Sequence, residues 1–136
     1  MGRGGAGNDE DMVGSGARDR ELTDAVEELA RADTLAFGGV GFAGTVLPVT
    51  EAYRRVEAAL AAHPDEVRGH VDRLLDRGSP AGRAYAATLL EQVDPGAARA
   101  AWTALRDDPA EFTTFTGCVM GRSSLREYAA DRLAAA

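Results

Sequence analysis

The chain has 136 residues and a formal net charge of −7 at pH 7, which is the size of one domain with its own hydrophobic core. Phosphate backbones and anionic lipids bind basic surfaces, so this acidic composition argues against nucleic-acid and membrane partners. No apolar run reaches the roughly 20 residues of a membrane span, and the N-terminus lacks the apolar core of a signal peptide. The single cysteine, Cys118, fits a reducing compartment, and we expect a cytoplasmic protein.

The amino-acid usage is biased in a way that reflects the genome more than the function. All 15 basic residues are arginine, isoleucine is absent, and alanine, glycine and acidic residues are plentiful. This usage is typical of a GC-rich bacterial genome, such as that of an actinomycete. The arginines therefore do not indicate arginine-specific recognition.

The N-terminal residues 1–17 are glycine-rich, polar and nearly devoid of large apolar side chains. Such a segment cannot offset the entropy lost on ordering, so it is predicted to be a disordered tail. From Asp19 to about Ala32, apolar residues recur at helical spacing, with acids at the start and Arg31 at the end. This pattern predicts a first helix and leaves residues 18–136 as a single helical domain.

The five prolines recur at nearly equal intervals in the middle of the chain, and proline suits the first position of a helix. Pro64, Pro80 and Pro95 have the flanks expected of helix starts, whereas Pro48 is expected to end a loop and Pro109 to mark the exit from a helix. The predicted helices run from Thr50 as N-cap, from Pro64 to a C-cap at Gly78, from Pro80 to Val93, from Pro95 to Arg106, and from a capping box at Ser124. The helix after Pro80 carries apolar groups on several faces and is expected to be central.

Two irregular segments interrupt the helices. Residues 33–49 mix glycines with apolar side chains in a way that favours extended chain and loop. Residues 112–116 favour a strand, and Gly117 permits a turn into residues 118–120. We expect a short β-hairpin here, which could pair with the extended residues 35–40.

The sequence between Ser79 and Leu105 resembles a HEAT-like helical repeat of the short kind found in phycobilisome lyase-type proteins. The matching residues are Ser79, Pro80, Arg83, Ala86, Ala87, Leu90, Asp94, Pro95, Ala98 and Leu105. The resemblance implies a mainly α fold, a compact HEAT-like α-α superhelix of about six helices, and a surface that binds other proteins. It implies no particular chemistry, because the matching residues are packing and turn positions.

A glycine-rich motif, Gly39-Val40-Gly41-Phe42-Ala43-Gly44, satisfies the G-x-G-x-x-G pattern of dinucleotide sites. A true site of that kind needs a helix that opens directly after the glycines and a surrounding βαβ unit. The following residues 45–48 are a poor helix start, so a structural loop is the favoured interpretation.

The remaining chemical candidates are few. His63, His70 and Glu66 could share one side of a helix, but a metal site needs a further convergent ligand. Cys118 lacks a histidine partner nearby in the sequence, so a buried small apolar side chain is favoured over a nucleophile. At their helical spacing, Tyr85 and Trp102 are expected to belong to the core.

No catalytic set, cofactor site or metal site is therefore predicted, and the favoured function is a non-enzymatic protein-interaction or regulatory domain. The residues expected to carry an interaction or a ligand lie in the two irregular segments; they are Phe37, Gly39, Gly41, Phe42, Cys118 and Arg122. The alternative is a small-molecule-binding protein or enzyme that uses residues 38–44 and the Cys118 turn. A further alternative, an acidic immunity or antitoxin-like partner, depends on the negative charge alone.

Overall fold

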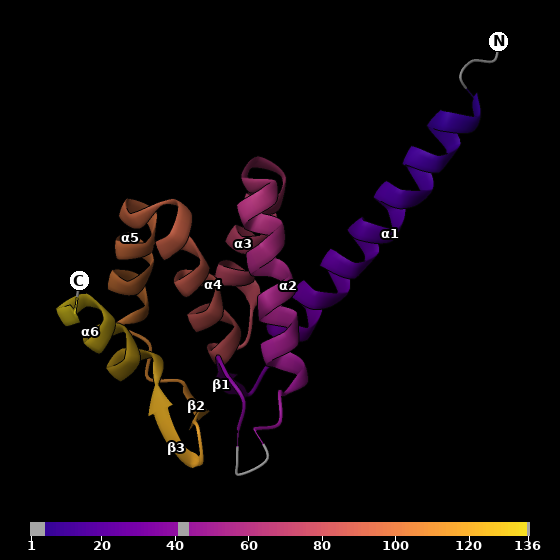
Figure 1. The fold of residues 1–136 in the computed structure, drawn as a ribbon. Helices are drawn as coiled ribbons and strands as arrows, with labels where there is room; N and C mark the ends of the chain where they lie inside the picture. The colour runs from indigo at the N-terminus through magenta and orange to yellow at the C-terminus, as the bar shows by residue number, and fades with distance from the viewer. Residues whose placement is uncertain (1–4, 41–43, 136) are drawn as a thin grey trace.

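The computed structural model describes the backbone of residues 5–40 and 44–135, and the side chains of residues 16–40 and 44–135. Over these residues the chain forms six helices and three short strands (Figure 1). In chain order they are α1 (Gly5–Ala30), β1 (Thr34–Ala36), α2 (Pro48–Ala62), α3 (Pro64–Arg77), α4 (Pro80–Val93), α5 (Pro95–Leu105), β2 (Glu111–Thr116), β3 (Val119–Ser124) and α6 (Leu125–Ala135). The prediction of a compact, mainly helical domain with one hairpin is confirmed. Within the described part of the chain, no helix is both long and apolar enough to cross a membrane.

Proline opens each of the helices α2 to α5. At α4 and α5 the preceding side chain is the cap, because Ser79 Oγ accepts from Gly82 N (3.1 Å) and Asp94 Oδ1 accepts from Ala97 N (3.0 Å). The expected starts at Pro64, Pro80 and Pro95 are therefore confirmed.

The expected start of α2 is wrong. The helix begins at Pro48, after Leu47, and no side chain caps it. Pro48 therefore opens the helix that it was expected to precede, since its fixed φ already suits the first turn. Thr50 is instead fully buried inside that first turn, where its hydroxyl donates to the Ala36 carbonyl (2.8 Å).

Helix α1 is longer than the sequence indicates, because it begins at Gly5 and includes residues that we expected to be a disordered tail. Once packing has nucleated a helix, each added residue contributes a further backbone hydrogen bond, so the helix extends beyond its packed part. The N-terminal half points away from the other helices (Figure 1). Among the described side chains of α1, in residues 16–30, Ala25 and Leu29 are buried. Residues 1–4 of the predicted tail lie outside the described residues.

Helix α4 lies at the centre, in contact with every other helix and with β1 and β2. Its small residues permit this: a Cβ on Gly82 would lie 2.4 Å from the Leu29 carbonyl oxygen, so only glycine fits against the end of α1. The Ser79 N–H donates to the Ala30 carbonyl (2.9 Å) at the same junction. Tyr85 of α4 and Trp102 of α5 are buried, which confirms their expected place in the core.

Gly78 follows the last residue of α3, as expected, but its role differs from that of a left-handed cap. Its backbone is extended, with φ −73° and ψ 169°. A Cβ there would lie 2.6 Å from the Leu74 carbonyl oxygen. Glycine is therefore required by a close approach and not by a positive φ.

The three strands form one sheet in the order β1-β2-β3, with β1 parallel and β3 antiparallel to β2. This confirms both the hairpin and its pairing with the segment that begins at Leu35. Ser124 ends β3 and caps α6, since its Oγ accepts from Glu127 N (3.1 Å). The predicted N-cap at Ser124 is confirmed.

Candidate functional site

The parallel pairing of β1 and β2 brings the two irregular segments to one end of the molecule. Ala36 lies opposite Phe115, so the chain leaves both strands in the same direction. The loop that follows β1 and the turn between β2 and β3 both lie at the lower end in Figure 1. We call this region the hairpin end and define it by Phe37, Cys118, Val119 and Met120.

The outer edge of β1 is closed by side chains from the helices. The Tyr85 hydroxyl accepts from Ala36 N (2.8 Å) and donates to Ala36 O (2.9 Å), and Thr50 Oγ1 donates to the same carbonyl. Burial raises the pKa of Tyr85 to about 12, so the hydroxyl keeps the proton that it donates. Both backbone groups of Ala36 are thus satisfied without another strand.

Phe37 directly follows Ala36, the last residue of β1, and its ring packs against two tyrosines. Its ring meets Tyr53 and Tyr85 edge-on, with centroids 5.0 and 5.3 Å away, while 38% of the residue stays exposed. Phe37 is therefore a partly exposed member of an aromatic cluster. The sequence could not show this, because the tyrosines come from α2 and α4.

The glycine-rich loop is only partly described. Val40 and Thr45 form a β-bridge, and a Cβ on Gly39 would lie 2.4 Å from the Gly44 carbonyl oxygen. Gly39 is therefore required by close packing within the loop, as the structural interpretation of the motif expects. The other two candidates, Gly41 and Phe42, lie outside the described residues.

The hairpin turn exposes its thiol and the two residues that follow. Gly117 has φ +60° and Cys118 does not have a positive φ, which fits a two-residue turn with glycine first. Cys118 is exposed, so the expectation that it is buried is wrong: it lies at the tip of the hairpin, beyond the core. Val119 and Met120 are 69% and 66% exposed.

Arg122 of β3 is held along the sheet. Its Nη1 donates to Thr113 Oγ1 (3.2 Å) and its Nη2 to Glu111 Oε1 (3.1 Å), both on β2. All three side chains lie on one face, and the ion pair is well exposed. The charge of Arg122 is thus paired within the hairpin. Because this ion pair is exposed, it stabilises the hairpin only weakly.

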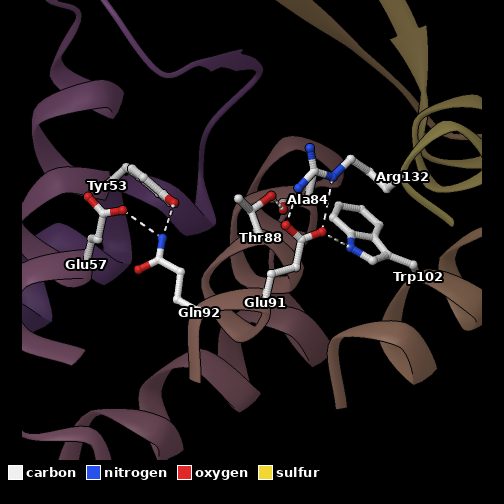
Figure 2. Close-up of polar contacts among 8 residues, drawn as sticks. All are labelled: Tyr53, Glu57, Ala84, Thr88, Glu91, Gln92, Trp102 and Arg132. Carbon is white, nitrogen blue, oxygen red and sulfur yellow. Dashed lines mark hydrogen bonds and ion pairs between the residues drawn. The ribbon is translucent and has the colours of Figure 1, made fainter. Parts of the chain in front are cut away.

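Two further polar clusters lie around α4 (Figure 2). Glu91 accepts from Trp102 Nε1 (2.7 Å) and forms an ion pair with Arg132, and this hydrogen bonding raises the pKa of Arg132. On the other side of α4, Gln92 Nε2 donates to the Tyr53 hydroxyl and to Glu57. Apart from Trp102, which was expected in the core, these residues were absent from the sequence-based candidates, and their contacts join α4 to α2, α5 and α6.

The histidines do not form a site with their neighbours. His63 is exposed and lies beside an open groove of about 510 Å³ between α1, α2 and α3, and His70 faces a different hollow, between α1 and α3. Within the described residues, no three His, Cys, Asp or Glu side chains converge in a way that could hold a metal ion.

No protein-family model matches the chain, and no curated protein or solved structure matches it significantly.

Proposed function

We propose that the chain is a non-enzymatic interaction or regulatory domain that binds a partner protein through the hairpin end. The observation that supports this is the placement of exposed apolar side chains. Of the four large hydrophobic residues exposed in the described part of the chain, Phe37, Val119 and Met120 lie at the hairpin end, and only Val93 lies elsewhere.

Apolar side chains that stay exposed after folding contribute little to the stability of the fold. Their surface can still be buried by a partner, so several of them at one place favour binding. Burying apolar surface contributes about 25 cal/mol per Å² of free energy. A partner that covers the hairpin end would bury these side chains and gain this free energy on binding. Clustered exposure of this kind is typical of interaction sites, whereas single exposed residues such as Val93 are ordinary. The net charge of −7 supports a protein partner over a nucleic acid. The exposed thiol of Cys118 fits a cytoplasmic location.

The test compares three tagged baits in an extract of the native host. They are the wild-type chain, a Val119→Ser/Met120→Ser double variant, and Val93→Ser as a matched control that removes an exposed valine from the end of α4. We expect a stoichiometric protein partner that wild type and Val93→Ser retain and that the double variant loses by about tenfold or more, which corresponds to roughly 1.4 kcal/mol.

Equal recovery by all three baits would contradict the proposal, as would the absence of any stoichiometric partner. The alternative, ligand binding by residues 38–44 and Cys118, predicts a different result. It requires a thermal shift with a metabolite that is lost in Cys118→Ser and kept in Val119→Ser/Met120→Ser.

A further inference from the structure

The two edge strands of the sheet, β1 and β3, differ in the hydrogen-bond partners of their outward backbone groups. The outward N–H and C=O of Ala36 in β1 bond to the Tyr85 and Thr50 hydroxyls. On the other side, β3 is the last strand of the sheet. Unpaired N–H and C=O groups on an edge strand are a template for another strand, so β3 is the edge at which a strand can be added.

The register shows which groups of β3 are free. Thr113 N donates to Asp33 O beside β1 (3.0 Å), so the Thr113 backbone points away from β3 and the pair Thr113↔Arg122 is not hydrogen-bonded. Because hydrogen-bonded and non-hydrogen-bonded pairs alternate, the backbones of Arg122 and Met120 point outward from β2. Across the described residues, no backbone hydrogen bond reaches either of them from outside the sheet.

We propose that a second copy of this chain pairs with this edge, β3 to β3, in an antiparallel dimer with Gly121 on the two-fold axis. The inference depends on the proposed function, because it names the partner that the hairpin end binds. Met120 of each copy would pair with Arg122 of the other through two backbone hydrogen bonds, which makes four in the dimer. The result is a continuous six-stranded sheet.

Three antiparallel registers, centred on Met120, Gly121 and Arg122, bring outward groups of the two copies face to face, and a fourth, centred on Ser123, would use Ser124, whose side chain caps α6. One centred on Arg122 sets two guanidinium groups directly opposite each other, and like charges in that position destabilise a sheet. One centred on Met120 pairs Arg122 with Cys118, which belongs to the turn and not to the strand. The register centred on Gly121 avoids both problems, and glycine leaves room where a non-hydrogen-bonded pair brings Cα atoms to about 4.5 Å.

The charged side chains of β2 and β3 are compatible with pairing of two copies at this edge. The only charged side chains of β2 and β3 are Glu111 and Arg122, and they pair with each other at 3.1 Å. The edge is therefore neutral locally, although two chains of charge −7 repel each other overall. Six-residue strands bury little area, so the dimer belongs to the weak, concentration-dependent class.

Sedimentation equilibrium of the purified chain tests the proposal between about 10 μM and 1 mM. We expect a monomer–dimer equilibrium that higher ionic strength strengthens, because salt screens the net repulsion. Met120→Pro removes one outward N–H from each copy, and edge positions of this kind tolerate proline. It should weaken the dimer about tenfold or more, while Met120→Ala keeps the backbone donor and weakens it less.

A disulfide test gives an independent readout that does not depend on the proline variant. Cys118→Ser/Gly121→Cys should form an intermolecular disulfide under mild oxidation, because the two-fold axis brings these Cα atoms within bridging distance. The added Cβ would approach Thr114 Oγ1 to 3.2 Å, which a small side-chain shift relieves. Cys118→Ser/Ser123→Cys is the matched control and should cross-link far less, since the axis separates those positions by four residues along the strands.

A chain that stays monomeric at 1 mM and does not cross-link through Gly121→Cys would overturn the second-copy proposal. So would a dimer that Met120→Pro leaves unchanged. If the protein is monomeric and a different partner is still lost by Val119→Ser/Met120→Ser, the interaction function stands without the dimer. If neither association is found, both proposals are wrong.

Discussion

At the scale of single residues, the Tyr85 hydroxyl joins the helical body to the sheet. It both donates to and accepts from the backbone of Ala36, and the residue is fully buried. Removing the hydroxyl would leave a buried N–H without a partner and the carbonyl with Thr50 alone, and unsatisfied buried groups cost about 1 to 3 kcal/mol. The loss should fall on β1 and on Phe37, which packs against Tyr85.

We expect Tyr85→Phe to lower the free energy of unfolding by about 1 to 3 kcal/mol, measured by urea denaturation at pH 7. Tyr128→Phe is the matched control. Tyr128 packs against Trp102 and Phe112 through its ring, and within the described residues its hydroxyl makes no hydrogen bond. An equal loss in the two variants would contradict the role given to the Tyr85 hydroxyl.

The contribution of Tyr85 to the free energy of unfolding depends on pH, and its sign follows from the shift in the pKa of the hydroxyl. The pKa of Tyr85 rises from 10.0 to about 12 on folding, so between these values the unfolded chain releases a proton that the native chain keeps. Stability from this group is complete below pH 10 and is lost as the pH rises toward 12. In Tyr85→Phe this part of the alkaline loss should be absent, whereas the part from Tyr53, whose pKa burial also raises, should remain.

At the scale of elements, two glycines in helices have opposite roles that the sequence does not distinguish. Gly82 lies in the first turn of α4, where a Cβ would meet the Leu29 carbonyl oxygen at 2.4 Å. Gly69 lies in the middle of α3, and nothing is within 4 Å of its Cβ position. The first glycine permits α1 and α4 to approach, and the second only weakens its helix.

We therefore expect Gly82→Ala to destabilise the protein by about 1 to 3 kcal/mol, because the backbones at the junction must separate. Gly69→Ala should stabilise it by about 0.5 to 1 kcal/mol through helix propensity. Thermal unfolding of the two variants checks both signs together. A stabilising Gly82→Ala would mean that the end of α1 does not pack against α4 in solution.

What the sequence predicts at this scale follows from local physics. Proline at a first turn, the Ser124 cap and the Gly117 turn act within a few residues. The predictions built on them are confirmed, except that Pro48 opens α2 and does not precede it. Pairing of the hairpin with the extended segment after Leu35 was also expected, but its parallel direction was not predicted. The HEAT-like resemblance stays a prediction.

Several features that the sequence did not predict require contacts between distant segments. Tyr85 is separated from Ala36 by 49 residues, and Gly82 meets a carbonyl of α1. The expected burial of Cys118 was wrong for a local reason, because the two-residue turn Gly117-Cys118 places this residue at the tip of the hairpin. At the candidate site, Phe37 and Cys118 were named, but Val119 and Met120 were missed. Their consecutive apolar character directly after a turn was the available signal.

At the scale of the whole molecule, the chain consists of a packed body and a helix that extends beyond it. Among residues 16–30, the part of α1 whose side chains the structure describes, Ala25 and Leu29 are buried, so the buried contacts described for this helix lie in its C-terminal half. Its N-terminal half points away from the other helices (Figure 1) and contains several glycines, which weaken a helix by about 1 kcal/mol each. The stability of the body should therefore depend little on the first residues.

We expect a chain that lacks residues 1–15 to unfold with a free energy within about 0.5 kcal/mol of the full-length protein, as for changes remote from the core. Far-ultraviolet circular dichroism and urea denaturation of the two chains provide the measurement. Leu29→Ala is the comparison at the packed end of α1, where loss of a fully buried leucine should cost about 2 to 5 kcal/mol. A truncated chain that loses as much as Leu29→Ala would show that the N-terminal half of α1 is part of the cooperative unit, and that the independently stable body is larger than residues 18–136.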